Sequence, residues 1–251
     1  MPATLDAAHE KFLETFRRHS LQSQGIWPAP YDQDTPGAGF RFLTECWWTW
    51  NEADGEIQPI PAKEYVEWLV HEWHGAMKAR QPLVLEKSRR LVASLIFRGL
   101  EAWQGGLRRT ECHLIDQTHE NSAEHLWRTW FSLDQLRQRK NWKGLEGFNR
   151  SSVRGSPDAK AVTHILLPNG SLFTQGHQDA GADQGKGKTI VTLEELSKYR
   201  NPSGFYAQAR IVTQGKATGT GGWVCAICNA SPNPEWHEIK GKEKARSLLE
   251  L

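Results

Sequence analysis

The spacing of hydrophobic residues changes at about residue 82, and this change separates two differently patterned parts of the chain. Before it, apolar residues recur every three or four positions in residues 5–19 and 62–79, which predicts two amphipathic helices. Between them, residues 25–61 are punctuated by Pro and Gly and contain the aromatic run FRFLTECWWTW. We predict an irregular or partly stranded layer there, packed over the core.

After residue 82, short apolar runs alternate with helical patterns. The predicted strands are residues 82–87, 110–116, 161–167, 171–176, 189–196 and 222–231, and the predicted helices are 93–104 and 119–138. The third and fourth strands flank Pro168, Asn169 and Gly170 and should form a hairpin. This alternation predicts an α/β fold with a mostly parallel sheet, helices on both faces and ligands at the carboxyl ends of the strands.

Composition and charge narrow the classes of function only slightly. The chain has 251 residues and a formal net charge of +2, so any contact with nucleic acid must come from a local patch. No apolar run approaches the about 18 residues of a membrane-spanning helix, and the N-terminus has no apolar signal-peptide core. We therefore expect a soluble, intracellular protein without a membrane partner.

Two motifs resemble metal-binding motifs, but a structural role explains each of them better. Of the four cysteines, only Cys225 and Cys228 form a CxxC, and they lie in a predicted buried strand and not on a turn, so a zinc site is not expected. The HEWH at residues 71–74 is one residue short of the spacing that places two histidines on one helical face. The twelve tryptophans are taken as packing residues.

The first candidate site follows the strand at residues 82–87. Against the phosphate-loop template GxxxxGK[ST], residues 87–94 match only at Ser94. Yet the segment offers helix N-terminal N–H groups, a hydroxyl, and a cation, Lys87, which can fold back over the phosphates with Arg89 and Arg90 nearby. By spacing alone, a strand that ends in exposed basic residues remains the alternative.

Two more strand ends carry candidate chemistry. Glu194 and Glu195 follow an apolar strand, as in a Walker B motif, where the first carboxylate supports Mg²⁺ and the second polarises the attacking water. The strand at 222–231 ends in Asn229, Ala230 and Ser231, small polar residues at a place where nucleotide-driven motors contact the γ-phosphate or the attacking water.

In this order, the segments resemble the large subunit of tailed-bacteriophage terminases, the ATPases that pump DNA into procapsids. Many members have a displaced Walker A motif, K-S-R/A-R-x-G-x-S, and this chain matches it at Lys87, Ser88, Arg89, Arg90 and Ser94. The aromatic segment at 40–61 resembles the family's entry segment, NGSLF its hairpin, and ASPN at 230–233 its S-T-P-N coupling motif. The resemblance covers about residues 40–240.

Three departures from the family pattern bear on the site. Val92 stands where the family usually has Gly, so the loop either avoids positive φ there or is strained. Glu194 replaces the more usual Asp and lengthens the arm that holds the metal. The family's nuclease half has no room in this chain, which we expect to be an isolated ATPase domain or a shortened gene product that does not cut DNA.

The resemblance implies an ASCE-type P-loop NTPase core at residues 61–251, preceded at 1–60 by an N-terminal helix and entry segment. It also implies a site in which Lys87 and Glu195 are catalytic, Glu195 orients the water, and Ser94 and Glu194 hold Mg²⁺. ATP would be cradled by Lys87, Ser88, Arg89, Arg90, Leu91, Val92, Ala93 and Ser94. Asn229, Ala230 and Ser231 would couple phosphate release to movement against DNA.

The implied partners are double-stranded DNA, the portal and procapsid, and the small terminase subunit, in the cytoplasm of the host. The chain would form a homo-oligomeric ring when assembled and be a monomer in isolation. Candidates for an arginine inserted into the neighbouring subunit's site are Arg137, Arg139, Arg150 and Arg154, with a solvated basic helix end as the alternative for each.

The glycine-rich residues 176–189 are interpreted as a mobile loop with Lys186 and Lys188 near nucleotide or DNA, or as an ordinary connection. Two alternatives to the packaging motor remain open. One is a nucleotide-gated DNA-binding or assembly module that does not hydrolyse ATP. The other is a helicase-like motor with the same core.

Overall fold

A computed structural model gives the structure of the protein. It describes residues 25–51, 55–88, 92–146, 148–152, 162–178, 188–214 and 222–248. The helix predicted at residues 5–19 lies outside these ranges. Within them, no helix is both long enough and apolar enough to cross a membrane.

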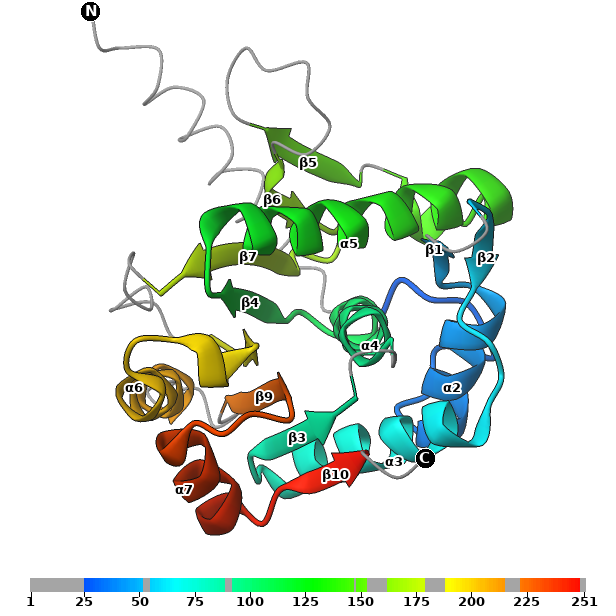
Figure 1. Ribbon diagram of the computed structural model, residues 1–251. Helices are drawn as coiled ribbons and strands as arrows, with labels where there is room; N and C mark the ends of the chain where they lie inside the picture. Colours follow the sequence, from blue (N-terminus) through cyan, green and yellow to red (C-terminus); the bar gives the residue numbers. More distant parts are fainter. Residues whose placement is uncertain are drawn as a thin grey trace, which may run out of the picture.

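The core of the fold is an eight-stranded sheet with the order β10-β3-β9-β8-β4-β7-β6-β5 (Figure 1). Its strands are β3 (Leu83–Lys87), β4 (Glu111–Asp116), β5 (Asn149–Ser152), β6 (Val162–Leu166), β7 (Leu172–His177), β8 (Ile190–Glu194), β9 (Trp223–Asn229) and β10 (Arg246–Leu248). From β10 to β7 all neighbours are parallel, whereas β6 and β5 continue the sheet antiparallel. The predicted mostly parallel sheet and the predicted hairpin of β6 and β7 are confirmed.

Helices cover both faces of this sheet and bury a separate apolar core against each (Figure 1). One face is covered by α2 (Pro36–Glu45), α3 (Glu64–Ala79), α4 (Ala93–Leu107) and α5 (His119–Lys140), and the other by α6 (Pro202–Gln214) and α7 (Pro234–Glu243). Alternate residues of a strand point to opposite faces. Cys225 therefore lies in the first core and Cys228 in the second, so the two thiols cannot bind one ion.

The region before β3 differs from the prediction of an irregular or partly stranded layer. Residues 36–45 form α2, and only β1 (Trp48–Trp50) and β2 (Ile57–Pro59) form a small antiparallel sheet. Pro36 does not break the helix because it occupies the first turn, where its missing N–H costs nothing, and the Thr35 side chain caps the helix by accepting from the Ala38 N–H. The buried Ala38, Phe42 and Leu43 then face the core.

Several element ends also differ from the prediction. β8 ends at Glu194 and β9 at Asn229, earlier than the predicted ends at 196 and 231. The helices α6 and α7, the strands β5 and β10, and the short 3₁₀ turns η1 (Lys143–Leu145) and η2 (Leu196–Lys198) were not predicted. α7 presents only Trp236 and Ile239 to the core, too few apolar positions for a periodic signal.

The tryptophans act mainly as packing residues, and some of their indole N–H groups donate to backbone carbonyls. Trp27 Nε1 donates to the Trp103 carbonyl at 2.7 Å, and Trp103 Nε1 donates to the Tyr31 carbonyl at 2.9 Å. The HEWH histidine His74 has a structural role as well, because its Nε2 lies 3.1 Å from Asp34 Oδ1 and ties α3 to the segment before α2.

Close packing of α4 against α2 gives a testable prediction about stability. A Cβ added at Gly99 would lie 2.3 Å from Leu43 Cδ2 and 2.8 Å from Trp47 Cδ1. We expect Gly99→Ala to lower the free energy of unfolding by about 1–3 kcal/mol through overpacking, measured by urea unfolding. Gly75→Ala is the matched control, because Gly75 is exposed on α3 with nothing within 4 Å, and it should be neutral or stabilise by up to about 1 kcal/mol. Equal stability of the two variants would contradict the packing described.

Candidate functional site

The carboxyl ends of β3, β9 and β8 meet at one edge of the sheet because the three strands are parallel neighbours. Lys87, the last residue of β3, pairs level with Asn229, the last residue of β9. Glu194, the last residue of β8, pairs with Ile227 of β9. Three strand ends that are far apart in the sequence thus lie side by side, as expected for the ligand-binding edge of such a sheet.

Lys87 points into this edge and not into solvent. Its side chain is 7% exposed, and its Nζ donates to Asn229 Oδ1 at 3.1 Å. The same Nζ lies 3.9 Å from Glu195 Oε1, to which Asn229 Nδ2 donates at 2.6 Å. Lys87, Asn229 and Glu195 therefore form one hydrogen-bonded group across three segments of the chain.

Glu195 has an unusual backbone conformation. With φ 51° and ψ 37° it lies in the left-handed region, which is uncommon for a residue other than Gly, and it is the single residue between β8 and η2. Its N–H donates to the Ile227 carbonyl at 2.8 Å, and its second oxygen, Oε2, lies 3.2 Å from Lys198 Nζ. Such strain persists where the surroundings hold it and is concentrated at functional sites.

The N-terminus of α4 opens at the same edge. Ser88 follows β3 and is half-buried, Arg89, Arg90 and Leu91 lie outside the described residues, and Val92 and the buried Ala93 begin the helix. Val92 has φ −77°, so the loop avoids positive φ there and the alternative of strain at this position is excluded. The helix has no side-chain N-cap and no acidic residue in its first turn, which leaves its leading N–H groups available to an anion.

Ser94 and Glu194 form the second half of the site. Ser94 Oγ donates to Glu194 Oε2 at 2.9 Å. Glu194 is 1% exposed, and its Oε1 accepts no hydrogen bond within the described part of the chain. A hydroxyl beside a buried carboxylate with an unpartnered oxygen is a set of hard oxygen donors, so these two residues fit a Mg²⁺ ion.

The segment after β9 is bonded to the segment after β8. Asn233 Nδ2 donates to the Ser197 carbonyl at 2.8 Å, and Asn233 Oδ1 caps α7 by accepting from the N–H groups of Glu235 and Trp236. Ala230 is exposed and Ser231 is half-buried, and both lie between Asn229 and this cap. Two short connections and the Asn233 hydrogen bonds thus link the ends of β8 and β9 to the start of α7.

The four arginines considered for insertion into a neighbouring subunit's site come from α5, β5 and the residues that follow β5. α5 starts after the carboxyl end of β4, and Arg137 and Arg139 lie in its last turn, at the opposite end of the helix. Arg137 pairs with Asp134 at 2.6 Å, and the Arg139 guanidinium lies 4.3 Å from the Trp48 ring centre. Arg150 belongs to β5, and Arg154 lies outside the described residues.

The expectation that Lys188 lies near the nucleotide is wrong for the site of its own chain. Lys188 is 3% exposed and precedes β8, at the edge of the sheet opposite to Glu194. Because a strand rises about 3.3 Å per residue, the length of β8 lies between Lys188 and Glu194. Lys186 falls outside the described residues.

The sequence interpretation missed four polar residues near the site: Arg98, Glu101, Asp116 and Lys198. Asp116, 2% exposed, ends β4 beside β8, and its Oδ2 lies 3.4 Å from His125 Nε2. Burial, together with the nearby carboxylates of Asp116 and Glu194, raises the pKa of the Tyr199 phenol, which is therefore neutral. An acid at the end of a third apolar strand was a signal that could have identified Asp116.

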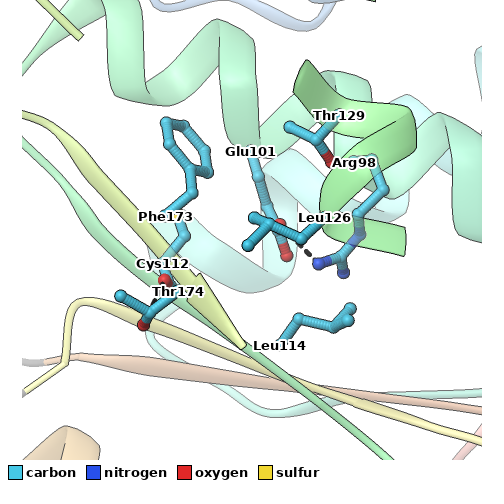
Figure 2. A pocket seen from close by; sticks show the side chains of 8 residues that line it. All are labelled: Arg98, Glu101, Cys112, Leu114, Leu126, Thr129, Phe173 and Thr174. Carbon is cyan, nitrogen blue, oxygen red and sulfur yellow. Dashed lines mark hydrogen bonds and ion pairs between the residues drawn. The ribbon is translucent and has the colours of Figure 1, made fainter. Parts of the chain in front are cut away.

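Arg98 and Glu101 lie on α4 and pair at 2.8 Å between Arg98 Nη1 and Glu101 Oε2 (Figure 2). Burial raises the pKa of Glu101, an effect that Arg98 and Thr192 oppose. Both side chains line a cavity of about 10 Å³, with Leu126 and Phe173 among its other walls (Figure 2). That volume suits about one water molecule and is too small for a nucleotide.

The chain matches no protein-family model and no curated protein. It is similar to the solved structure of the large terminase of bacteriophage HK97, with a TM-score of 0.59 and 12% identity over 85% of this chain and 43% of the terminase. The large terminase of the thermophilic bacteriophage D6E gives a TM-score of 0.48 and 14% identity over 76% of this chain and 46% of that protein. The chain thus spans less than half the length of either terminase. It shares its fold with the HK97 large terminase, and it has the mostly parallel α/β sheet that the sequence predicted.

Proposed function

We propose that this chain is the ATPase motor domain of a viral terminase large subunit, which hydrolyses ATP to move double-stranded DNA into a procapsid. The observation that carries the proposal is the meeting of Lys87, Asn229 and Glu195 beside the Ser94–Glu194 pair at the carboxyl edge of the sheet. The fold shared with the HK97 large terminase supports it. So does the order of the motifs along the chain.

In the proposed site, the triphosphate lies at the N-terminus of α4. The free N–H groups of the first helical turn bind phosphate oxygens, and Lys87 reaches them from β3. Lys87 is buried and therefore needs a partner for its charge at all times. Phosphate oxygens replace Asn229 Oδ1 and Glu195 Oε1 in that role when the nucleotide binds.

Glu195 is the proposed residue that acts on water. Once Lys87 turns to the phosphates, a Glu195 oxygen can accept a hydrogen bond from a water and orient it for in-line attack on the γ-phosphorus, with ADP leaving. Asn229 keeps the carboxylate in place through its 2.6 Å hydrogen bond. Mg²⁺, held by Ser94 and Glu194, would supply neutralisation of the phosphate charge.

The contacts of Lys87 with Asn229 and Glu195 would form again when the γ-phosphate is lost. Lys87 returns to Asn229 and Glu195, and the change reaches α7 through Asn233, which bonds to Ser197 and caps the helix. The proposed partners are DNA, the portal and procapsid, and the small terminase subunit, in the cytoplasm of the host. A homo-oligomeric ring would bring an arginine of a neighbouring subunit to each site.

Removal of the Lys87 ammonium tests nucleotide binding. We expect Lys87→Ala to weaken ATP binding at least about 30-fold, because one partner of a buried, charge-assisted contact contributes about 2–5 kcal/mol. Isothermal titration calorimetry measures the change. Lys242→Ala, an exposed lysine on α7, is the control and should bind as the unchanged protein does. Unaltered binding by Lys87→Ala would show that the nucleotide does not lie at this edge.

Neutralising Glu195 tests hydrolysis separately from binding. We expect Glu195→Gln to keep ATP affinity and to lower kcat by about 10²–10⁴, the usual contribution of a positioned base, because Gln can still accept from Asn229. The measurement is phosphate release at saturating ATP with DNA present, and Glu238→Gln on α7 is the exposed control. Turnover at the original rate would argue against the motor. ATP binding without phosphate release by the unchanged chain, with or without DNA, would favour the nucleotide-gated module instead.

A further inference from the structure

The helix α4 carries a row of polar residues on a face that is buried against the sheet. Ser94, Arg98 and Glu101 follow each other at intervals of four and three residues, so they lie one above the other. Arg98 and Glu101 are 3% and 2% exposed. They face β8, where Thr192 and Glu194 point to the same side because they are two residues apart.

The contacts between this row and β8 form a continuous chain, which we call the α4–β8 polar seam: Ser94, Glu194, Arg98, Glu101 and Thr192. Ser94 Oγ donates to Glu194 Oε2, and Arg98 Nη2 lies 4.0 Å from the other oxygen of the same carboxylate. Arg98 Nη1 pairs with Glu101 Oε2, and Thr192 Oγ1 donates to Glu101 Oε1. The seam thus starts at the candidate metal ligands and returns to β8 two residues below Glu194.

Stability alone gives no reason for this arrangement. The seam buries two carboxylates and one guanidinium, and a buried ion pair is often no more stabilising than apolar residues of the same size. The seam is also incomplete, because Glu194 Oε1 and Arg98 Nε and Nη2 have no hydrogen-bond partner in the described part of the protein. One negative charge is left over at its upper end, beside Ser94.

Side chains of α5 lie close to the Arg98 guanidinium. Arg98 and Glu101 extend from α4 toward each other, and Leu126 and Thr129 of α5 line the same small cavity (Figure 2). The lysines of the site are placed differently, since Lys87 and Lys198 both contact Glu195. Among the described contacts, Arg98 is the cation beside Glu194.

We infer that Arg98 is a positioning residue for the metal-binding pair: anchored to β8 through Glu101 and Thr192, it fixes the Glu194 carboxylate against Ser94, so that both oxygens are set for one divalent cation. The inference rests on the proposed function, because it assigns Ser94 and Glu194 to Mg²⁺. Residues behind metal ligands commonly change metal affinity by about 10- to 100-fold when they are replaced.

The test uses a double variant, Arg98→Met with Glu101→Met, which removes the lower seam and leaves the net charge of the cluster unchanged. Mn²⁺ serves as the probe for Mg²⁺, and its binding to the full chain in the presence of ADP is measured from the electron paramagnetic resonance signal of free Mn²⁺. We expect the Mn²⁺ dissociation constant to rise at least about 10-fold. ADP binding in EDTA and the unfolding temperature should not fall, because apolar replacements of a buried ion pair preserve stability.

Two further variants make every outcome decisive. Arg98→Lys keeps the charge but not the two-pronged donor, and should weaken Mn²⁺ binding less than the double variant does. Glu194→Gln removes a proposed ligand and should raise the Mn²⁺ dissociation constant, measured in the presence of ADP. If Glu194→Gln binds Mn²⁺ as tightly as the unchanged chain, the proposed metal site fails. If Glu194→Gln is impaired but the double variant binds normally, the inference about Arg98 alone is overturned. Should the double variant not fold, unchanged Mn²⁺ affinity in Arg98→Lys overturns the inference.

Discussion

Burial of charge at the ends of three parallel strands is the constraint on which the candidate site depends. The alignment of β3, β9 and β8 places Lys87, Asn229 and Glu194 at one edge, where each group is largely removed from water. A buried charge is costly unless a neighbour compensates it. Lys87 and Glu195 compensate each other through Asn229, which comes from the strand between them. The chemistry of the site therefore depends on the strand order.

The two cores hold this strand order in place. β9 is apolar on both faces, with Cys225 and Ile227 on the α4 side and Val224 and Ala226 on the α6 side. A strand of this kind gives little polar signal for its own register, because a shift by one residue exchanges apolar residues for apolar residues. The polar groups at its end supply that signal. Only the observed register brings Asn229 level with Lys87 and lets the Glu195 N–H bond to the Ile227 carbonyl.

The sequence located the buried strands because parallel strands are apolar runs, and it placed the end of β3 correctly at Lys87. It set the ends of β8 and β9 two residues too late, at 196 and 231 instead of Glu194 and Asn229. It did not predict α2, since Pro36 and the neighbouring glycines look like a loop unless the capping role of Thr35 is known. Nor could it predict the role of Arg98, because a cation in a helix usually faces solvent, and its neighbour Glu194 is distant in the sequence. Lys188 precedes β8 in the sequence and therefore lies at the amino end of the strand, away from Glu194. The sequence pattern also does not predict that β9 lies between β3 and β8, because strand order is set by the packing of the whole chain.

The two halves of the site differ in how far they are satisfied without a ligand. Glu195 Oε1 accepts from Asn229, and Lys87 and Lys198 place two cations beside this carboxylate, although its Oε2 has no hydrogen-bond partner among the described residues. Glu194 keeps an oxygen without a partner among the described residues and is open to a cation. A triphosphate that draws Lys87 away weakens the hold on Glu195, while a metal ion satisfies Glu194. In the proposed reaction, the binding step itself therefore frees the group that orients water, and the strained backbone of Glu195 places that group beside both halves.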